Sequence, residues 1–253
     1  PGRDGRVFVP SAPGTRADNP PSEPAFSLGG TDRVVLRADR ALIRLDGAAA
    51  IVDAQGRVSV VGEGADAWLS GMAAFIVGRP WFDYAYTGFA RTSDPDGSLR
   101  YVGERTDGAA RIRQEQTVRA EGRSLVIEYR WTALTDARFV MFRHQTDLPA
   151  TAYGGGRARI GGATVSLPVV KGPVPELGKG ADGLVVQTRK RPELSISHSS
   201  PANLVDERHY GVNAYRLGSH PAPSIVKAGD TWSLTVRVAT GPLPVPSAAP
   251  TNR

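Results

Sequence analysis

The residues best suited to chemistry form one run: Asp206, Glu207, Arg208, His209 and Tyr210. A carboxylate beside an imidazole can orient a general acid or base, and a tyrosine hydroxyl can also transfer a proton. In the structural alternative, a carboxylate binds the Arg208 guanidinium and anchors a loop that faces a sugar. We favour the loop anchor. We keep Asp206, Glu207, His209 and Tyr210 as candidate catalytic residues and Arg208 as a candidate sugar contact.

His144 is a further candidate catalytic residue, and its neighbour Arg143 is a candidate sugar contact. His144 lies near the end of an apolar run, and functional residues are common where strands give way to loops. A histidine at such a position is more often part of a hydrogen-bonded structure. His198 has serines on both sides but no Gly-x-Ser-x-Gly elbow, so a serine hydrolase is not indicated.

Residues 81–86 (WFDYAY) form the richest aromatic stretch of the chain. Sugars expose apolar C–H faces that stack on aromatic rings, while their hydroxyls need charged or amide side chains. Trp81 and Asp83 supply both types and are candidate sugar contacts. The alternative is a core strand, because Phe82, Tyr84 and Tyr86 would share one face at a period of two.

The composition excludes several classes of site. The chain of 253 residues has no cysteine, which excludes disulfide scaffolds, Cys-ligated zinc, iron–sulfur clusters and cysteine nucleophiles. Four histidines and two methionines leave few ligands for a transition metal, so we expect neither a metal nor a cofactor. No apolar run approaches the ~18–20 residues of a transmembrane helix, so we expect no membrane span.

The positive charge is diffuse. Net charge is +6, but the 31 basic residues alternate with acidic ones along much of the chain. This pattern argues against a nucleic-acid surface, which gathers its lysines and arginines on one face. Attraction to an acidic glycan stays open, because diffuse positive charge concentrates anions of any kind.

The hydrophobic period is two almost everywhere, which predicts antiparallel strands joined by short turns. The exception is 65–77, where helical spacing favours either a helix or two strands. We expect an all-β protein with little helix, folded as a large antiparallel two-sheet sandwich. The clearest strand candidates are 34–45, 99–104, 110–118, 124–134, 137–146, 163–167, 183–188, 193–198, 213–217 and 231–239.

We expect one β-sandwich domain over 29–240, with a Pro/Gly-rich extension at 1–28 and a Pro/Ala-rich tail or linker at 241–253. Proline-rich segments favour extended chain that separates domains or lies over them. Proline-rich ends, the absence of cysteine and the lack of a lysine-rich surface favour a bacterial protein that is secreted, periplasmic or on the cell surface and whose leader has been removed. The alternative is a domain excised from a longer chain, since the first residue is Pro1.

The order of motifs resembles the galactose-mutarotase-like β-supersandwich superfamily. The motifs are a Gly-rich hairpin at Tyr153-Gly-Gly-Gly156, then Val165-Ser-Leu-Pro168, Asp206-Glu-Arg208 ahead of Tyr210-Gly211, Asn213-Ala-Tyr215-Arg-Leu217, and Ala228-Gly-Asp-Thr-Trp232 before the last strand.

The resemblance implies a supersandwich, as in sugar epimerases, polysaccharide lyase domains and accessory domains of glycoside hydrolases. Its epimerase members hold two histidines and a glutamate around the anomeric carbon. Arg143-His144 is a candidate for one such element, but no His-x-Tyr-Phe-Asn-Leu segment follows. Tyr153, beside the Gly-rich hairpin, is a further candidate sugar contact.

The sequence is compatible with three functions. The first is a carbohydrate-binding or accessory domain acting on a polysaccharide or oligosaccharide, with a glycan as its partner. The second is a glycan-active enzyme, either a hydrolase, a lyase or an epimerase. The third is a structural surface or assembly protein. A homo-oligomer or a tethered catalytic domain is compatible with each.

Overall fold

The computed structural model describes residues 34–37, 39–62, 67–77, 85–86, 89–188 and 191–241. Most of these residues form strands, with one helical turn α1 (Ala150–Tyr153) and one 3-10 turn η1 (Glu207–Tyr210). The prediction of an all-β sandwich is confirmed. The strands are β1 (Val34–Leu36), β2 (Arg40–Leu45), β3 (Ala48–Asp53), β4 (Val58–Val61), β5 (Ala67–Val77), β6 (Ala85–Tyr86), β7 (Ala90–Ser93), β8 (Leu99–Asp107), β9 (Ala110–Glu121), β10 (Ser124–Ala133), β11 (Ala137–Pro149), β12 (Arg157–Ile160), β13 (Ala163–Ser166), β14 (Glu176–Thr188), β15 (Arg191–Asp206), β16 (Ala214–Ser219), β17 (Ile225–Val226) and β18 (Thr231–Thr240).

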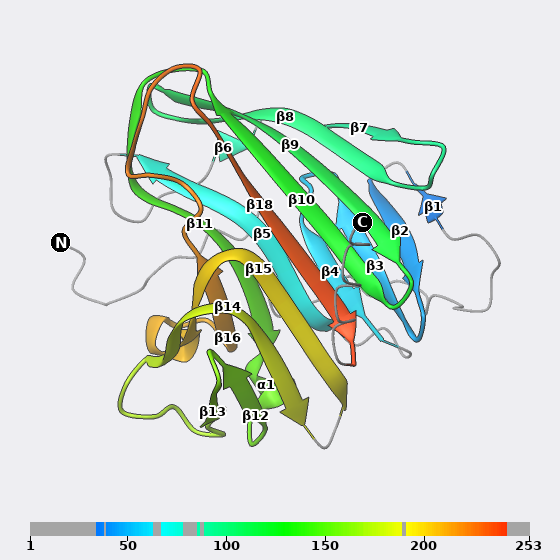
Figure 1. Ribbon diagram of the computed structural model, residues 1–253, viewed down its shortest axis with the longest axis vertical. Helices are drawn as coiled ribbons and strands as arrows, with labels where there is room; N and C mark the ends of the chain where they lie inside the picture. Colours follow the sequence, from blue (N-terminus) through cyan, green and yellow to red (C-terminus); the bar gives the residue numbers. More distant parts are fainter. Residues whose placement is uncertain are drawn as a thin grey trace, which may run out of the picture.

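The strands form one curled antiparallel sheet whose two layers face each other (Figure 1). One layer runs through β8, β9, β10 and β18. The other runs through β4, β5, β11 and β16. Strand β15 belongs to both layers, because Leu194–His198 pair with β18 and Ala202–Asp206 pair with β16.

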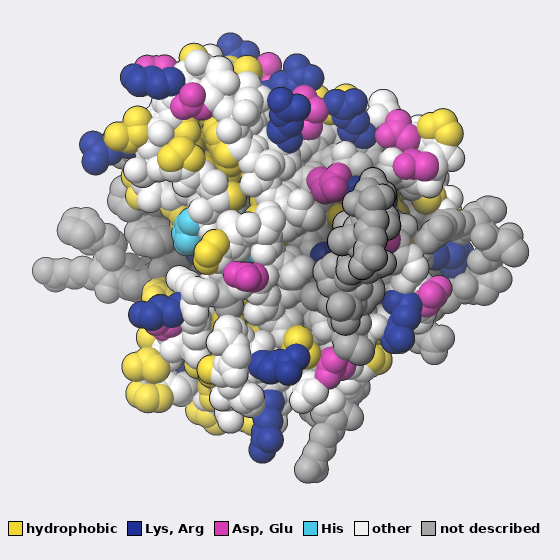
Figure 2. All heavy atoms as spheres, viewed as in Figure 1, with side chains coloured by type: hydrophobic (Ala, Val, Ile, Leu, Met, Phe, Trp, Pro, Cys, Tyr) yellow, Lys and Arg dark blue, Asp and Glu magenta, His cyan; other side chains and the backbone are white. Residues whose placement is uncertain are grey.

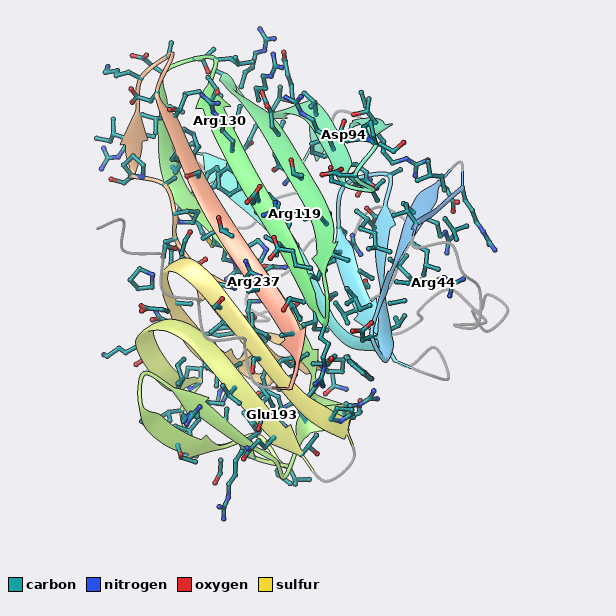
Figure 3. All side chains as sticks on the ribbon, turned by 45° about the vertical axis from the view of Figure 1, so that its right-hand side comes forward. Arg44, Asp94, Arg119, Arg130, Glu193 and Arg237 are labelled. Carbon is teal, nitrogen blue, oxygen red and sulfur yellow. The ribbon has the colours of Figure 1, made fainter. Side chains whose placement is uncertain are left out.

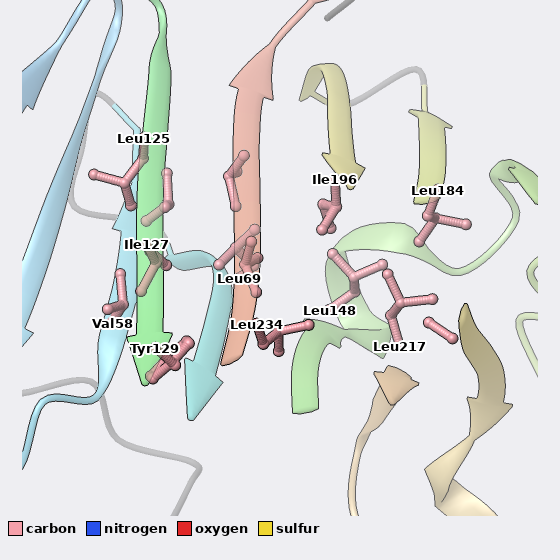
Figure 4. Packing of buried hydrophobic residues seen from close by; sticks show 14 of the residues in the cluster. Val58, Leu69, Leu125, Ile127, Tyr129, Leu148, Leu184, Ile196, Leu217 and Leu234 are labelled. Atoms are coloured by element: carbon pink, nitrogen blue, oxygen red, sulfur yellow. The ribbon is translucent and has the colours of Figure 1, made fainter. Parts of the chain in front are cut away.

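The core lies between the layers and is built from alternate residues of each strand. Strand β9 alternates buried and exposed side chains from Ala110 onward, as a strand with one covered face must. Leu125, Ile127 and Tyr129 of β10 belong to the same apolar core as Leu69 of β5, and Leu148 and Leu217 extend this core (Figure 4).

A group of aromatic rings fills the centre of this core. Trp131 stacks on Tyr129 at 5.3 Å between ring centroids and meets Phe142 edge-on at 5.1 Å. Trp232, its register partner on β18, stacks on it at 6.2 Å. The Trp131 indole N–H donates to Gln114 Oε1 at 3.0 Å, so the one polar group of this ring is paired.

The outer face of β9, β10 and β18 carries interleaved charges. Arg119 pairs with Glu121 and Glu128, and Arg237 pairs with Glu121 at 2.6 Å (Figure 3). Because opposite charges lie next to each other across the strands, this face has no single sign. On this face, the folded protein keeps the diffuse charge expected from the sequence.

The segment expected to be a helix or two strands is one strand, β5, which pairs with β4 and β11. Its apolar residues mimic helical spacing because both faces are covered. Trp68 is 7% exposed and Leu69, on the opposite face, is 1% exposed. A Cβ at Gly62 would lie 2.3 Å from the Trp68 ring, so the ring lies over that glycine.

The glycine-rich hairpin expected around residue 153 instead begins with a helical turn. The Gly154 N–H donates to Ala150 O at 2.8 Å and closes α1, and β12 starts at Arg157. A Cβ at Gly156 would lie 2.6 Å from the carbonyl oxygen of Gln187 on β14, so the close approach of two backbones requires glycine there.

The extension at 1–28, and the tail at 241–253 apart from Gly241, lie outside the described residues. In the part of the chain that is described, no helix has the length and apolar character needed to cross a bilayer.

We predict that Trp131→Ala lowers the free energy of unfolding by about 3–5 kcal/mol, because it leaves a cavity at the centre of the aromatic core. Arg130→Ala is the matched control, since Arg130 is the exposed neighbour on the same strand. It should change the free energy by no more than about 0.5 kcal/mol. Urea denaturation followed by circular dichroism measures both, and equal effects would contradict this description of the core.

Candidate functional site

Polar side chains gather on one face of β11 and β16, on the side away from the aromatic core. Arg143, Gln145 and Asp147 alternate along β11 and therefore share a face. The register places Asp147 opposite Arg216 of β16. The turn η1 adds Glu207, which contacts both arginines. We call these five residues the polar cluster.

The polar cluster is held by two ion pairs on one guanidinium. Arg216 binds Asp147 in a bidentate arrangement, with Nε–Oδ1 at 2.6 Å and Nη2–Oδ2 at 2.8 Å. Arg216 Nη1 lies 3.0 Å from Glu207 Oε1, and Arg143 Nη1 lies 4.0 Å from the same oxygen. The planar fork of arginine suits this double contact and fixes the carboxylates in place.

Burial divides the polar cluster into an inner and an outer part. The side chains of Arg216 and Glu207 are 2% and 6% exposed, whereas those of Arg143 and Asp147 are 18% and 19% exposed. The inner pair orients the outer pair. Arg143 and Asp147 therefore offer donors and acceptors to solvent from fixed positions.

Glu207 has the chemistry of a proton-transfer group. Burial raises the pKa of its carboxyl above the usual value, although the charges of Arg216 and Arg143 act in the opposite direction. A carboxyl with a raised pKa, beside two cations on a polar face, is a candidate general acid or base.

Arg208 is a loop anchor, as the sequence predicts. Its guanidinium binds the buried Asp206 carboxylate in a bidentate contact of 2.8 and 2.7 Å. It also donates to the carbonyl oxygens of Pro168 and Val169 and lies 5.1 Å from the centroid of the Tyr215 ring. Burial acts to raise the pKa of Asp206, but the hydrogen bonds from Arg208 outweigh it and hold that pKa below its usual value.

The other candidate residues from the sequence do not all lie near the polar cluster. His209 and Tyr210 share the turn η1 with Glu207, and Tyr210 is 37% exposed. Tyr153 is 1% exposed and packs in the core, so its ring has almost no surface to offer a sugar. Trp81 and Asp83 lie outside the described residues.

His144 faces the core, because it follows Arg143 on the strand and so points to the opposite face. Its ring lies 5.1 Å from the Tyr129 ring and 5.2 Å from the His198 ring. Within the described residues, neither histidine ring nor the Tyr129 hydroxyl has a hydrogen-bond partner. Burial lowers the pKa of His144 well below 6.5 and that of His198 to about 4, so both rings are neutral near pH 7.

Sequence reasoning missed Arg216 and the contact between the two histidines. Asp147 and Arg216 are 69 residues apart in sequence, and only the pairing of β11 with β16 brings them together. The signal available was a charged residue at an alternate position inside an apolar strand. In the described part of the chain, no group of three or more His, Cys, Asp or Glu residues is arranged to hold a metal.

We predict that the protein loses stability below pH 6.5 because of the buried histidines. Their folded-state pKa values lie below the unfolded value, so the unfolded chain binds more protons. The contribution is complete above pH ~6.5, and each histidine removes about 1.4 kcal/mol per pH unit as the pH falls toward 4. Urea midpoints between pH 7 and pH 5 measure the slope, and His144→Leu should reduce it by about half. A slope unchanged by that substitution would contradict the assignment.

We predict that Arg208→Ala costs about 3–5 kcal/mol of stability, because it leaves the buried Asp206 carboxylate unpaired. The control is His209→Ala in the same turn, which should cost about 1 kcal/mol or less. Thermal melting compares the two variants. A larger loss for His209→Ala would show that the turn depends on the imidazole instead.

Known proteins resemble this chain in structure but not in sequence. No protein-family profile matches the sequence. No curated protein sequence matches it either. Solved structures do match, at low identity. A candidate aldose 1-epimerase from Escherichia coli K12 superposes with a TM-score of 0.57 and 11% identity, covering 78% of this chain and 97% of that one.

Two further solved structures also match this chain over most of its length. A galactose mutarotase-like protein from Lactobacillus casei has a TM-score of 0.55 and 10% identity, with 79% and 99% of the two chains covered. A 4-alpha-glucanotransferase from Thermococcus litoralis has a TM-score of 0.53 and 10% identity, and the match spans 79% of this chain but 39% of that enzyme. The sandwich and the path of its strands are therefore those of the galactose-mutarotase-like fold.

Proposed function

We propose that this protein is a carbohydrate-binding or accessory domain that contacts a polysaccharide or oligosaccharide through the polar cluster. The observation that carries the proposal is the pair of outer side chains: Asp147 is held by the buried Arg216, and Arg143 lies 4.0 Å from the buried Glu207. A sugar hydroxyl both donates and accepts hydrogen bonds, so a guanidinium and a carboxylate on the same face of one strand suit the several hydroxyls of a sugar. The structural neighbours described as sugar epimerases and glucan-active enzymes support the same class of ligand.

Tyr210 supplies the apolar half of such a contact. It is the exposed aromatic side chain of the turn that also carries Glu207. Sugar rings stack their C–H faces on aromatic side chains, and an exposed tyrosine gives this surface at a small entropic cost. We further propose, from the composition alone, that the protein is bacterial and works outside the cytoplasm.

We predict that a glycan array identifies a ligand and that calorimetry then shows Arg143→Ala and Tyr210→Ala weakening its binding by about 10-fold to 100-fold. Arg138→Ala is the matched control, because Arg138 is an exposed arginine on the same strand, outside the polar cluster. Binding that survives both substitutions would place the ligand on another surface. The absence of any glycan ligand would count against the proposal itself.

A second candidate function is an enzyme that uses Glu207 as a proton-transfer group, and the raised pKa of its carboxyl is the observation that favours it. The position of His144 does not support this enzyme. His144 faces the core, so β11 does not bring an imidazole and the Glu207 carboxylate to the same face.

The test is polarimetry of freshly dissolved glucose and galactose, with glycan cleavage assayed on any ligand that the array identifies. Glu207→Gln should lower turnover by about 10²–10⁴-fold if Glu207 transfers the proton. A wild type without turnover that still binds glycan would favour the binding domain. The amide is isosteric, so circular dichroism of Glu207→Gln separates loss of chemistry from loss of fold.

A further inference from the structure

Residues 168–175, in the connection between β13 and β14, expose an unusual amount of apolar surface. Val169, Val170 and Val174 are 70%, 79% and 57% exposed. They are three of the seven large hydrophobic side chains exposed in the described part of the chain. We call residues 168–175 the valine loop. Hydrophobic side chains gather at the lower-left edge in Figure 2, where Figure 1 shows this loop extending from the end of the β12–β13 hairpin.

The valine loop is held at both ends by the unit formed by Asp206 and Arg208. Arg208 Nη2 donates to Pro168 O at 2.7 Å, and Arg208 Nη1 donates to Val169 O at 2.6 Å. At the other end, the Asp206 N–H donates to Pro175 O at 2.7 Å. The Tyr215 hydroxyl also donates to Pro168 O.

The sequence of the loop limits its freedom further. Leu167, immediately before it, is 1% exposed and packs in the core. Prolines at 168, 173 and 175 fix their own backbone angles and restrict the residue before each. The three valines are therefore displayed on a fixed loop, although burying them elsewhere would be favourable by the hydrophobic effect.

The sequence around the loop carries more basic than acidic side chains. Lys171 lies between the valines and is exposed, and Arg157 and Arg159 are exposed on β12. The nearest acidic residue in sequence is Glu176, which pairs with Lys179 at 3.6 Å. From residue 157 to residue 179 the chain carries four basic side chains and one acidic one.

Shape and charge together indicate what covers this surface. A stable protein interface needs about 800 Å² from each partner, and three valines on a projecting loop provide far less. A small apolar tip beside basic side chains fits the boundary between headgroups and acyl chains, where apolar groups insert and cations meet anionic lipid. We propose that the valine loop docks the protein on an anionic lipid bilayer.

The first test is flotation of the protein with vesicles made of equal parts of phosphatidylglycerol and phosphatidylcholine. The wild type should float with these vesicles and not with pure phosphatidylcholine. Val170→Glu should lower the partition coefficient at least about ten-fold, because a carboxylate at the tip opposes insertion. Lys171→Glu should weaken binding too, and added salt should weaken the wild type. Val140→Glu is the matched control, since Val140 is 61% exposed on β11.

A second measurement shows which part of the protein enters the bilayer. The chain has no cysteine, so Val170→Cys and Val140→Cys can each carry one environment-sensitive fluorophore. The probe at position 170 should brighten and shift to shorter wavelength on anionic vesicles, and the probe at position 140 should not. Glycan binding should be unchanged in Val170→Glu, so this test is separate from that of the proposed function.

Three results would overturn the proposal. One is an absence of flotation with anionic vesicles. Another is equal flotation of Val170→Glu and Val140→Glu. The third is a dimer, seen in sedimentation, that Val170→Glu abolishes, because the valines would then meet a second copy of the chain.

Discussion

The fold depends on one strand that must belong to both layers of the sandwich. Strand β15 has 16 residues, and its two halves pair with different neighbours. Pro201 lies between the halves and has no N–H to donate to a ladder, so regular pairing cannot continue through it. Just before it, Ser199 Oγ accepts the Thr235 N–H of β18 at 2.9 Å and ends that ladder with a side chain. The remaining residues of β15 then pair with β16, and this change of partner places Glu207 of η1 in the polar cluster.

The same switch explains why the strand was only partly predictable. The alternating pattern predicts a strand at 193–198, and a proline shortly afterwards is a normal reason to end it. The strand continues to Asp206 because β16 offers a second partner, which a single sequence does not reveal. Strand β5 shows the opposite difficulty. Trp68 and Leu69 are both buried because the strand is covered on both faces, and local spacing cannot distinguish this pattern from a helix.

The candidate site could be predicted where it is local in sequence and not where it depends on register. Asp206 and Arg208 are two residues apart, and their ion pair follows from the chemistry of neighbouring side chains. Asp147 and Arg216 meet because an alignment of two strands makes them opposite, and no local pattern contains that alignment. His144 shows how one position on a strand decides the outcome. Arg143 reaches the polar cluster, and the adjacent imidazole is enclosed among aromatic rings.

This alternation on β11 bears on how the sequence can change over evolutionary time. Replacing a side chain on β11 alters one contact, but inserting or deleting one residue ahead of Arg143 would exchange the two faces of the strand beyond that point. The guanidinium would enter the aromatic core and the imidazole would leave it. Length variation among homologues should therefore collect in the connections between strands and be rare within β11, even where the residue types along that strand differ widely.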